Sequence, residues 1–365
     1  MVRIRDIIST LEQVAPLAYQ ESYDNAGLVV GDPETPVDKL LICLDVTDDI
    51  LEEAKAGNCQ LIIAHHPLIF KPIRQLSVHN RVERCLIRAI HNNIAIYVIH
   101  TNLDNVAQGV NKRLAHLLGL HAPTILSPKA GMRLKLTTFV PPSALKKVTE
   151  ALHEAGAGQL GNYTHCSFVS TGTGSFKPSL DARPYLGAPG QPETVQEHRV
   201  EVTFPSHRST AIIQALQQAH PYEEVAYDIQ KLENTCSDIG LGMVGMLPQP
   251  LATPAFLQHI KTCMHVPYLR HSRPIQRPIQ RVAVCGGSGS TLLPVALLQQ
   301  ADALITADVK YHDFFEADDR LLLVDIGHYE SEVATIDLLY HLLSEKFVSI
   351  VLTKCQTVTN PVYYA

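Results

Sequence analysis

The stretch Leu61-Ile62-Ile63-Ala64-His65-His66-Pro67 joins a short apolar run to a pair of histidines. Four consecutive apolar residues are typical of a strand that is buried on both faces of a parallel sheet. Pro67 then turns the chain, so both imidazoles can approach one site at the end of the strand. The stretch therefore predicts a sheet strand that ends at a functional position.

Apolar runs and helical patterns alternate on both sides of this stretch. We expect strands at 40–46, 61–64 and 94–100, and helices at 48–56, 80–92 and from 109. The pattern returns late in the chain, with expected strands at 281–285, 303–306 and 321–326 and helices at 292–300, 312–317 and 331–344. Such alternation indicates parallel strands joined by crossover helices, with ligands bound outside the carboxyl ends of the strands.

The middle of the chain has a different order of elements. Its expected strands are 134–140, 166–170, 198–204 and 224–229, and its expected helices are 143–155 and 209–218. This β-α-β-β-α-β order is that of the ferredoxin-like split motif. Residues 172–196 carry several Gly and Pro without periodicity and are expected to form a loop. The predicted fold class is α/β, with a discontinuous domain from residues 1–128 and 246–365 and an inserted ferredoxin-like α+β domain at 129–245.

The composition excludes several classes of protein. The chain has 365 residues, of which 46% are hydrophobic and 18% charged, so it can bury a sizeable core and is not a disordered chain. Its formal net charge of −6 gives no electrostatic reason to bind nucleic acid or an anionic membrane. No apolar run approaches the length of a membrane span, and Arg3, Arg5 and Asp6 argue against a signal peptide. We therefore expect a cytoplasmic protein without a membrane or nucleic-acid partner.

Histidine and carboxylate residues follow three of the expected strands. The first cluster is His65 and His66, the second is His100-Thr101-Asn102-Leu103-Asp104, and the third is Gly327-His328-Tyr329-Glu330-Ser331-Glu332. A single histidine beside a strand is more often a hydrogen-bonded structural residue than a ligand. Three such clusters in one α/β domain instead favour a metal site at the carboxyl edge of the sheet.

The residue types in these clusters suit two divalent cations. Imidazole with carboxylate favours zinc, manganese or iron over calcium or magnesium. Asp104 or Glu332 could bridge the two ions, while His65, His66 and His328 fill the terminal positions. Two such ions can hold a bridging water and lower its pKa, giving a hydroxide nucleophile at neutral pH. The pattern therefore indicates hydrolytic chemistry.

Two further motifs follow expected strands, and each has two possible interpretations. Gly286-Gly287-Ser288-Gly289-Ser290 fits either a backbone amide nest for an anion or a simple tight turn. Lys310 and His312 are candidate catalytic residues, which could contact an anionic substrate or transfer a proton. They could equally form the solvated start of a helix.

The motifs together resemble the long bacterial members of the family named after Ngg-one-interacting factor three, often labelled GTP cyclohydrolase one type two homologues. The matching stretches are Glu21-Ser22-Tyr23-Asp24-Asn25-Ala26-Gly27-Leu28, the three clusters above, 306–312, Gly172-Thr173-Gly174-Ser175-Phe176-Lys177-Pro178 and His220-Pro221-Tyr222-Glu223-Glu224. Two departures are Tyr23, where the family commonly has Trp, and Ala307, where it usually has Gly. Neither position is a proposed ligand.

The resemblance implies a dinuclear metal centre with His65, His66, Asp104, His328 and Glu332 as ligands. It implies two divalent ions per chain, with zinc favoured and manganese or iron as alternatives. It also implies a PII-like or CutA-like insert, a toroidal homohexamer, and a small-molecule substrate such as GTP, whose imidazole ring is opened by hydrolysis. The alternative function is a metal-containing hexameric regulatory or scaffold protein, whose insert binds a small molecule or a protein partner.

Overall fold

The computed structural model describes residues 1–364 and divides the chain into two compact units. The first unit combines Met1–Pro128 with Ser237–Ala365, and the second is Lys129–Cys236. The second boundary thus precedes the position expected after residue 245. The reason is that Met243, Val244 and Gly245 already pair with a strand in the sheet of the first unit.

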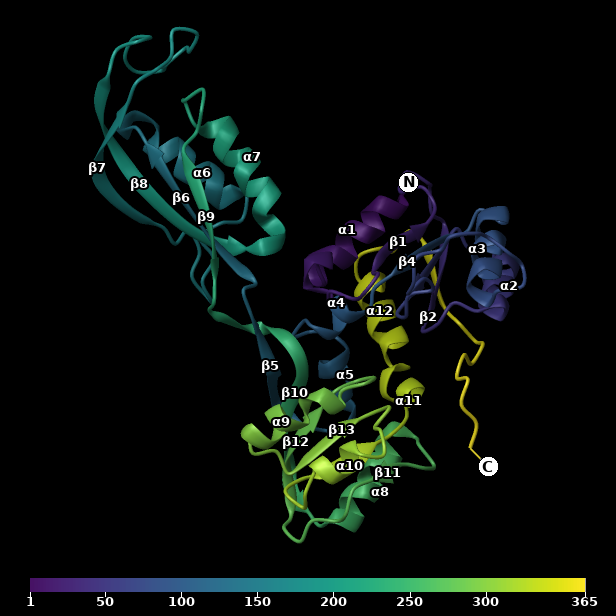
Figure 1. The fold of residues 1–365 in the computed structure, drawn as a ribbon. Helices are drawn as coiled ribbons and strands as arrows, with labels where there is room; N and C mark the ends of the chain where they lie inside the picture. Colours follow the sequence, from purple (N-terminus) through teal and green to yellow (C-terminus); the bar gives the residue numbers. More distant parts are fainter. Residues whose placement is uncertain (365) are drawn as a thin grey trace. The chain divides into compact units, whose positions relative to one another are not determined.

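The first unit contains two separate sheets, each covered by helices (Figure 1). The first sheet has the strand order β1 (Gly27–Val30), β4 (Ala95–Val98), β3 (Leu61–Ala64), β2 (Lys39–Cys43) and β15 (Val351–Lys354). All neighbours are parallel except β1, which runs antiparallel to β4. The carboxyl ends of β2, β3 and β4 therefore lie at one edge of this sheet.

Helices cover both faces of the first sheet because successive strand residues point to opposite faces. One apolar core packs α2 (Asp48–Ala56) and α3 (Arg81–His91) against the face that carries Leu41, Ile62 and Ile96. On the other face, Tyr97 donates a hydrogen bond to Glu12 of α1 (Ile4–Val14), and α12 (Thr335–Ser344) contacts β2 and β15. The sheet is therefore the central layer of an α/β/α arrangement.

The second sheet is built mainly from the C-terminal part of the chain. Its strand order is β11 (Arg270–His271), β14 (Leu322–Asp325), β13 (Ala303–Thr306), β12 (Ile279–Val284), β10 (Thr235–Leu251) and β5 (His121–Ala130). Strands β12, β13 and β14 are parallel, whereas β10 runs antiparallel to β12 and β11 runs antiparallel to β14. One face packs against α5 (Val110–Leu117) and α8 (Thr253–Met264), and the other against α9 (Leu293–Leu298).

The second unit is a four-stranded antiparallel sheet with two helices on one face (Figure 1). Its elements follow in the order β6 (Arg133–Val140), α6 (Leu145–Glu154), β7 (Phe168–Phe176), β8 (Glu193–Pro205), α7 (Ser209–Ala219) and β9 (Tyr227–Leu232). The strand order across the sheet is β7-β8-β6-β9. Apolar residues of β6 and β8, such as Leu136 and Val202, form one core with α6 and α7.

Short segments complete the fold. The short helices are α4 (Thr101–Asp104), α10 (Asp313–Glu316) and α11 (His328–Glu332), and 3-10 turns occur at Leu17–Tyr19, Pro142–Ala144, Ser206–Arg208 and Ser290–Leu292. Among the described residues, no helix has the length and apolarity required to cross a bilayer.

The structure corrects three expectations about the elements. The strands that precede the candidate ligands belong to two sheets rather than to the edge of one. Both ends of the expected loop 172–196 are strand, because Phe168–Phe176 of β7 pairs with Glu193–Glu201 of β8 in an antiparallel hairpin. The expected helix 331–344 is two helices, α11 and α12, and the first of them begins at His328.

The junction between α4 and α5 suggests a test of the packing that fixes the position of Asp104. Gly109 precedes α5, and an added Cβ would lie 1.7 Å from the carbonyl oxygen of Leu103 in α4. The new methyl group would clash with the backbone of α4, which cannot move aside as a flexible side chain can. Gly109→Ala should therefore lower the free energy of unfolding by about 2–3 kcal/mol or more. Gly172→Ala is the control, because its Cβ would meet nothing within 4 Å. Urea unfolding of both variants measures the difference, and equal midpoints would contradict the prediction.

Candidate metal centre

Polar side chains follow the strands of the first sheet at the edge where β2, β3 and β4 end. Asp45 comes shortly after β2, His65 and His66 directly follow β3, and His100 precedes α4, which ends at Asp104. The strands themselves are continuous buried apolar runs. The change from apolar to polar residues at the strand ends therefore brings these groups to one place.

The second sheet contributes a matching set from its own carboxyl edge. The glycine-rich turn Gly286-Gly287-Ser288-Gly289 follows β12, Asp308 follows β13, and α11 follows β14. Gly327, with a φ of +91°, lets the chain turn sharply into α11. His328 and Glu332 then lie four residues apart on one face of this short helix, as expected from their spacing.

The Glu332 carboxylate joins the two sets. Its Oε2 atom lies 2.8 Å from Nε2 of His66 and 3.1 Å from Nε2 of His328. Its Oε1 atom lies 4.0 Å from Nε2 of His65. The ligand atoms of His65, Asp104 and Glu332 all lie within 4.8 Å of one another, as do those of His66, His328 and Glu332. The structure thus brings all five of the predicted metal ligands into one cluster.

Two buried atoms of the cluster have no hydrogen-bond partner. They are Nε2 of His65 and Oδ1 of Asp104, which lie 3.7 Å apart. Nδ1 of His65 lies 2.8 Å from the carbonyl oxygen of Ile99 and must donate to it, so Nε2 of the neutral ring carries a lone pair. That lone pair faces the oxygens of Asp104 and Glu332. A cation placed between these facing acceptor atoms would satisfy both of them, so these residues fit a metal ion.

Burial and the neighbouring charges set the protonation of the cluster. Burial lowers the pKa of His65 to about 3, so its ring is neutral. Burial alone would also lower the pKa of His66, but hydrogen bonds to Asp45 and Glu332 outweigh it and raise the pKa to about 10. Burial opposes the charged form of His328 as well, yet its contacts with Glu332 and Asp308 raise its pKa to about 9.

The two carboxyl groups of the cluster shift in opposite directions. Burial and the charge of Glu332 raise the pKa of Asp104 well above its usual value. Burial would also raise the pKa of Glu332, but the hydrogen bonds from His328 and His66 hold it well below its usual value. The protonated rings of His66 and His328 therefore balance the charge of Glu332, and a divalent cation would take the place of these protons.

Each histidine is oriented through its Nδ1 atom. His66 Nδ1 lies 2.8 Å from Asp45, and His328 Nδ1 lies 2.7 Å from Asp308. Such partners fix the ring and direct Nε2 toward the ligand position. Asp45 and Asp308 were not assigned roles from the sequence. The only available signal was that each follows a strand adjacent to one that carries a predicted ligand.

His100 is a further residue that the sequence analysis did not assign. Its ring centroid lies 5.3 Å from that of His65, and its ligand atom groups with those of His65 and His66. Its Nδ1 atom lies 2.8 Å from Asp24. Burial would raise the pKa of Asp24, but hydrogen bonds from His100 and Thr101 outweigh it and lower this pKa to about 2. Asp24 thus orients His100 as Asp45 orients His66.

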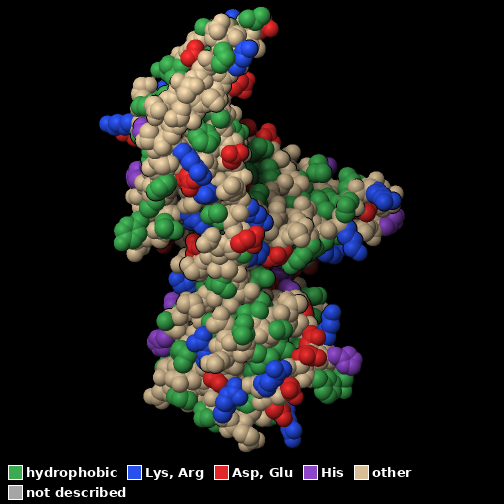
Figure 2. Space-filling model, turned by 60° about the vertical axis from the view of Figure 1, so that its left-hand side comes forward, with side chains coloured by type: hydrophobic (Ala, Val, Ile, Leu, Met, Phe, Trp, Pro, Cys, Tyr) green, Lys and Arg blue, Asp and Glu red, His purple; other side chains and the backbone are tan. Residues whose placement is uncertain are grey.

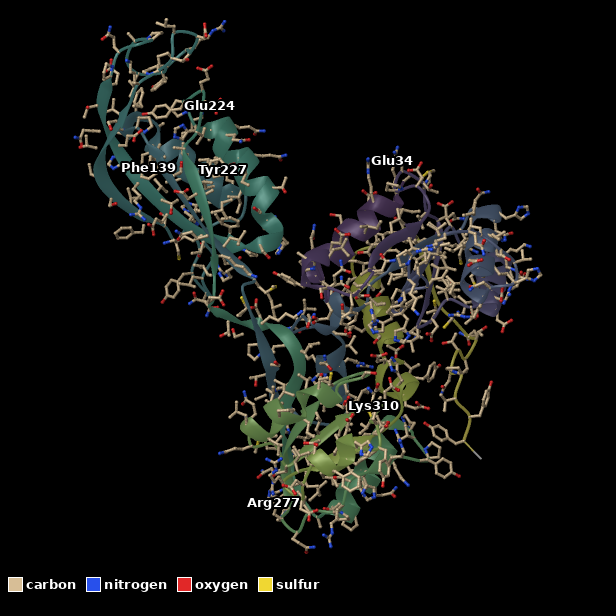
Figure 3. All side chains as sticks on the ribbon, in the orientation of Figure 1. Glu34, Phe139, Glu224, Tyr227, Arg277 and Lys310 are labelled. Carbon is tan, nitrogen blue, oxygen red and sulfur yellow. The ribbon has the colours of Figure 1, made fainter. Side chains whose placement is uncertain are left out.

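Lys310 and His312 are exposed and lie outside the cluster. Both follow β13 on the way into α10, and His312 is the residue that precedes this helix. Lys310 is labelled in Figure 3. Neither lines the cavity of about 1010 Å³ above the cluster or the second cavity of about 410 Å³ beside His66 and His328. Their catalytic role therefore stays a prediction.

The glycine-rich turn supports the ligands and is not a free amide nest. The amides of Gly286, Gly287 and Gly289 donate to the side chains of Asn111, Ser331 and Thr306, at 2.9, 2.9 and 2.8 Å. Three of the amides proposed for an anion are thus already bonded within the protein. The amide-nest interpretation is wrong for these three groups, and the turn instead packs against α11.

Comparisons with known proteins agree with this architecture. The family model Duf34/NIF3 (NGG1p interacting factor 3) matches residues 2–361. A protein of Halalkalibacterium halodurans named GTP cyclohydrolase 1 type 2 homolog is 37% identical over 324 residues, covering 88% of this chain and 87% of its own. A protein of Bacillus subtilis with the same name is also 37% identical, over 334 residues, covering 90% and 89%.

A solved structure has the same fold over the full length. It is the Bacillus cereus protein related to NIF3, which is 35% identical, has a TM-score of 0.83, and covers 100% of this chain and 99% of its own. The described structure is likewise a mixed α/β protein with several sheets. Together with the family match over residues 2–361, these similarities show that the chain belongs to the Duf34/NIF3 family.

Proposed function

We propose that this protein is a metal-dependent hydrolase that acts on a nucleotide-like small molecule. The observation that carries the proposal is the pair of buried, unpartnered atoms, His65 Nε2 and Asp104 Oδ1, beside the Glu332 carboxylate. Without a cation, the burial of these unpaired acceptor atoms would lower the stability of the protein and serve no function.

Two overlapping groups of ligand atoms support two ions per chain. Both include Glu332, which would bridge, while His65 with Asp104 would hold one ion and His66 with His328 the other. The mixture of imidazole and carboxylate favours zinc, with manganese or iron as alternatives. When bound, such ions supply activation of water as a nucleophile and polarisation of an electrophilic carbon in the substrate.

The residues of this chain prepare the site in three ways. Asp45, Asp308 and the Ile99 carbonyl fix the imidazoles before any ligand arrives. His100 lines the cavity above the cluster and is held by Asp24, so its imidazole is positioned to contact a substrate. Leu68, Leu241 and Leu292 line the same cavity and give it an apolar surface that a heterocycle can contact.

The substrate proposal takes its first candidate from the relatives. Two of them carry the name GTP cyclohydrolase 1 type 2 homolog, so hydrolytic opening of the GTP imidazole ring is the first reaction to test in this protein. A substrate screen should compare GTP and related nucleotides with defined metals on the wild type and His65→Ala/His66→Ala. Turnover that is present in the wild type and absent in the variant supports the proposal. The absence of turnover in metal-loaded wild type would contradict it.

A second candidate function is regulatory and concerns the inserted unit. We infer that this unit is a ferredoxin-like domain, because its order of elements is β-α-β-β-α-β. A cavity of about 620 Å³ within it, lined by groups such as Tyr222, Glu197 and Arg199, has the size of a small-molecule site. In that function the chain would form a hexameric ring with structural metals. Native mass spectrometry measures the number of chains in the assembly, and a mass other than that of six chains would contradict the hexamer.

Removing the charge of the Glu332 carboxylate, which both candidate ligand groups share, tests the metal site. We expect Glu332→Gln to weaken zinc binding by at least about tenfold, because Gln keeps the shape of the side chain but removes its charge. The matched control is Glu330→Gln on the same short helix, where the carboxylate accepts a hydrogen bond from Asn360 Nδ2 at 2.9 Å. Metal content and competitive chelator titration measure binding. Equal zinc affinity in the two variants would contradict the assignment of Glu332.

The glycine-rich turn offers an independent test without altering any ligand. Gly287 has a φ of +60°, and an added Cβ would lie 2.4 Å from Glu332 Oε1. Gly287→Ala should therefore displace the carboxylate and weaken zinc binding. Gly119→Ala is the control, since Gly119 has a φ of +69° but open space around it. Both variants should lose about 1 kcal/mol of stability from the backbone strain, and only Gly287→Ala should lose metal affinity.

A further inference from the structure

The cavity above the metal cluster has a second wall that the metal chemistry does not use. This wall is the loop between β3 and α3, whose residues from Pro67 to Gln75 line the cavity together with the first turn of α3. The volume of the cavity, about 1010 Å³, exceeds what a single heterocyclic ring would fill. The reacting part of a substrate would therefore occupy only a fraction of the space.

The charges of this wall are predominantly positive. Lys71, Arg74 and Arg81 line the cavity, and none of the three forms an ion pair among residues 1–364. Arg81 donates from Nη1 to the carbonyl oxygen of Val46 at 3.1 Å, which fixes its position. Lys71 and Arg74 are exposed and are free to reach a ligand.

Few carboxylates near this wall compete for the three cations. Outside the metal cluster, the carboxylates that line the cavity are Asp45 and Glu83. Asp45 is hydrogen-bonded to His66 and to Thr359, and Glu83 accepts from the amide of Ser77 at 2.8 Å. The wall therefore has more positive than negative charge available to a ligand.

Two aromatic rings lie in the same cavity. Tyr23 and Phe70 line it with exposed fractions of 69% and 55%, and the Phe70 ring centroid lies 5.9 Å from that of His100. Exposed rings beside a polar cluster offer a stacking surface for a planar heterocycle. The cavity thus combines a metal cluster, aromatic rings and a cationic wall.

We propose that Lys71, Arg74 and Arg81 form a phosphate subsite, so that the substrate is a phosphorylated heterocycle rather than its uncharged nucleoside or base. The proposal rests on the hydrolase function above and names the class of its substrate. Guanidinium groups bind phosphate oxygens through paired hydrogen bonds, and a multiply charged anion gains most from three adjacent cations. The phosphate would be held at the loop, while the heterocycle reaches His100 and the cluster.

Binding to the full-length protein as purified tests this subsite without requiring turnover. The probes are GTP, guanosine, inorganic tripolyphosphate and citrate, with the metal content measured before and after each titration. The variant is Lys71→Gln/Arg74→Gln, which removes two cations that make no contact needed for folding. The control is Lys346→Gln/Arg273→Gln, which loses the same charge at exposed positions outside the cavity.

We expect the wild type and the control to bind GTP and tripolyphosphate in preference to guanosine. The variant should bind both phosphate probes at least about tenfold more weakly, with guanosine binding and metal content unchanged. No tripolyphosphate binding by the wild type, or equal binding by the variant, would overturn the proposal. Citrate that binds as tightly as tripolyphosphate would show an unselective anion site and overturn the assignment to phosphate. Phosphate binding without any turnover would instead remove the hydrolase function and leave the subsite standing.

Discussion

The contact on which the candidate site depends is the one between Glu332 and His66. It joins a carboxylate at the edge of the second sheet to an imidazole at the edge of the first, at 2.8 Å. Glu332 is 3% exposed, so its charge must be balanced inside the protein. The histidines of both sheets provide that balance, which ties the two edges together through one buried charge.

The residues around the candidate ligands explain why the cluster is already ordered in the structure, which contains no metal. Carboxylates of Asp45, Asp308 and Asp24 hold the Nδ1 atoms of three histidines, and a backbone carbonyl holds that of His65. The glycine-rich turn is fixed by Asn111, Ser331 and Thr306, and it lies close to Glu332. A site prepared in this way loses little entropy when a cation binds, which favours tight binding.

The cavity above the cluster separates two kinds of chemistry. His66, His100 and Glu332 belong to the candidate metal cluster, whereas the wall formed by the loop after β3 and the first turn of α3 adds cations that are in none of the candidate ligand groups. On the face shown in Figure 2, acidic and basic side chains are otherwise interspersed. A wall with unpaired cations inside a cavity would limit recognition to anions small enough to enter.

Local patterns in the amino-acid sequence predict the strands, their alternation with helices and the types of residue at the strand ends. Strands β3 and β13 and helix α2 have the predicted bounds, because fully buried apolar runs and Thr47 with Asp48 at a helix start are local signals. The family and the five candidate ligands could also be predicted, since their motifs lie in short contiguous stretches. Lys310 and His312 were chosen by the same local rule, and the fold leaves both exposed.

By contrast, local patterns do not predict that two sheets, rather than one, supply the cluster. Which strands become neighbours depends on packing between segments hundreds of residues apart, as for His66 and Glu332, and no local pattern encodes it. For the same reason the roles of Asp45, Asp308 and His100, the bonded amides of the glycine-rich turn and the cationic wall emerged only with the fold. Their significance lies in distances between side chains, which a single sequence does not contain.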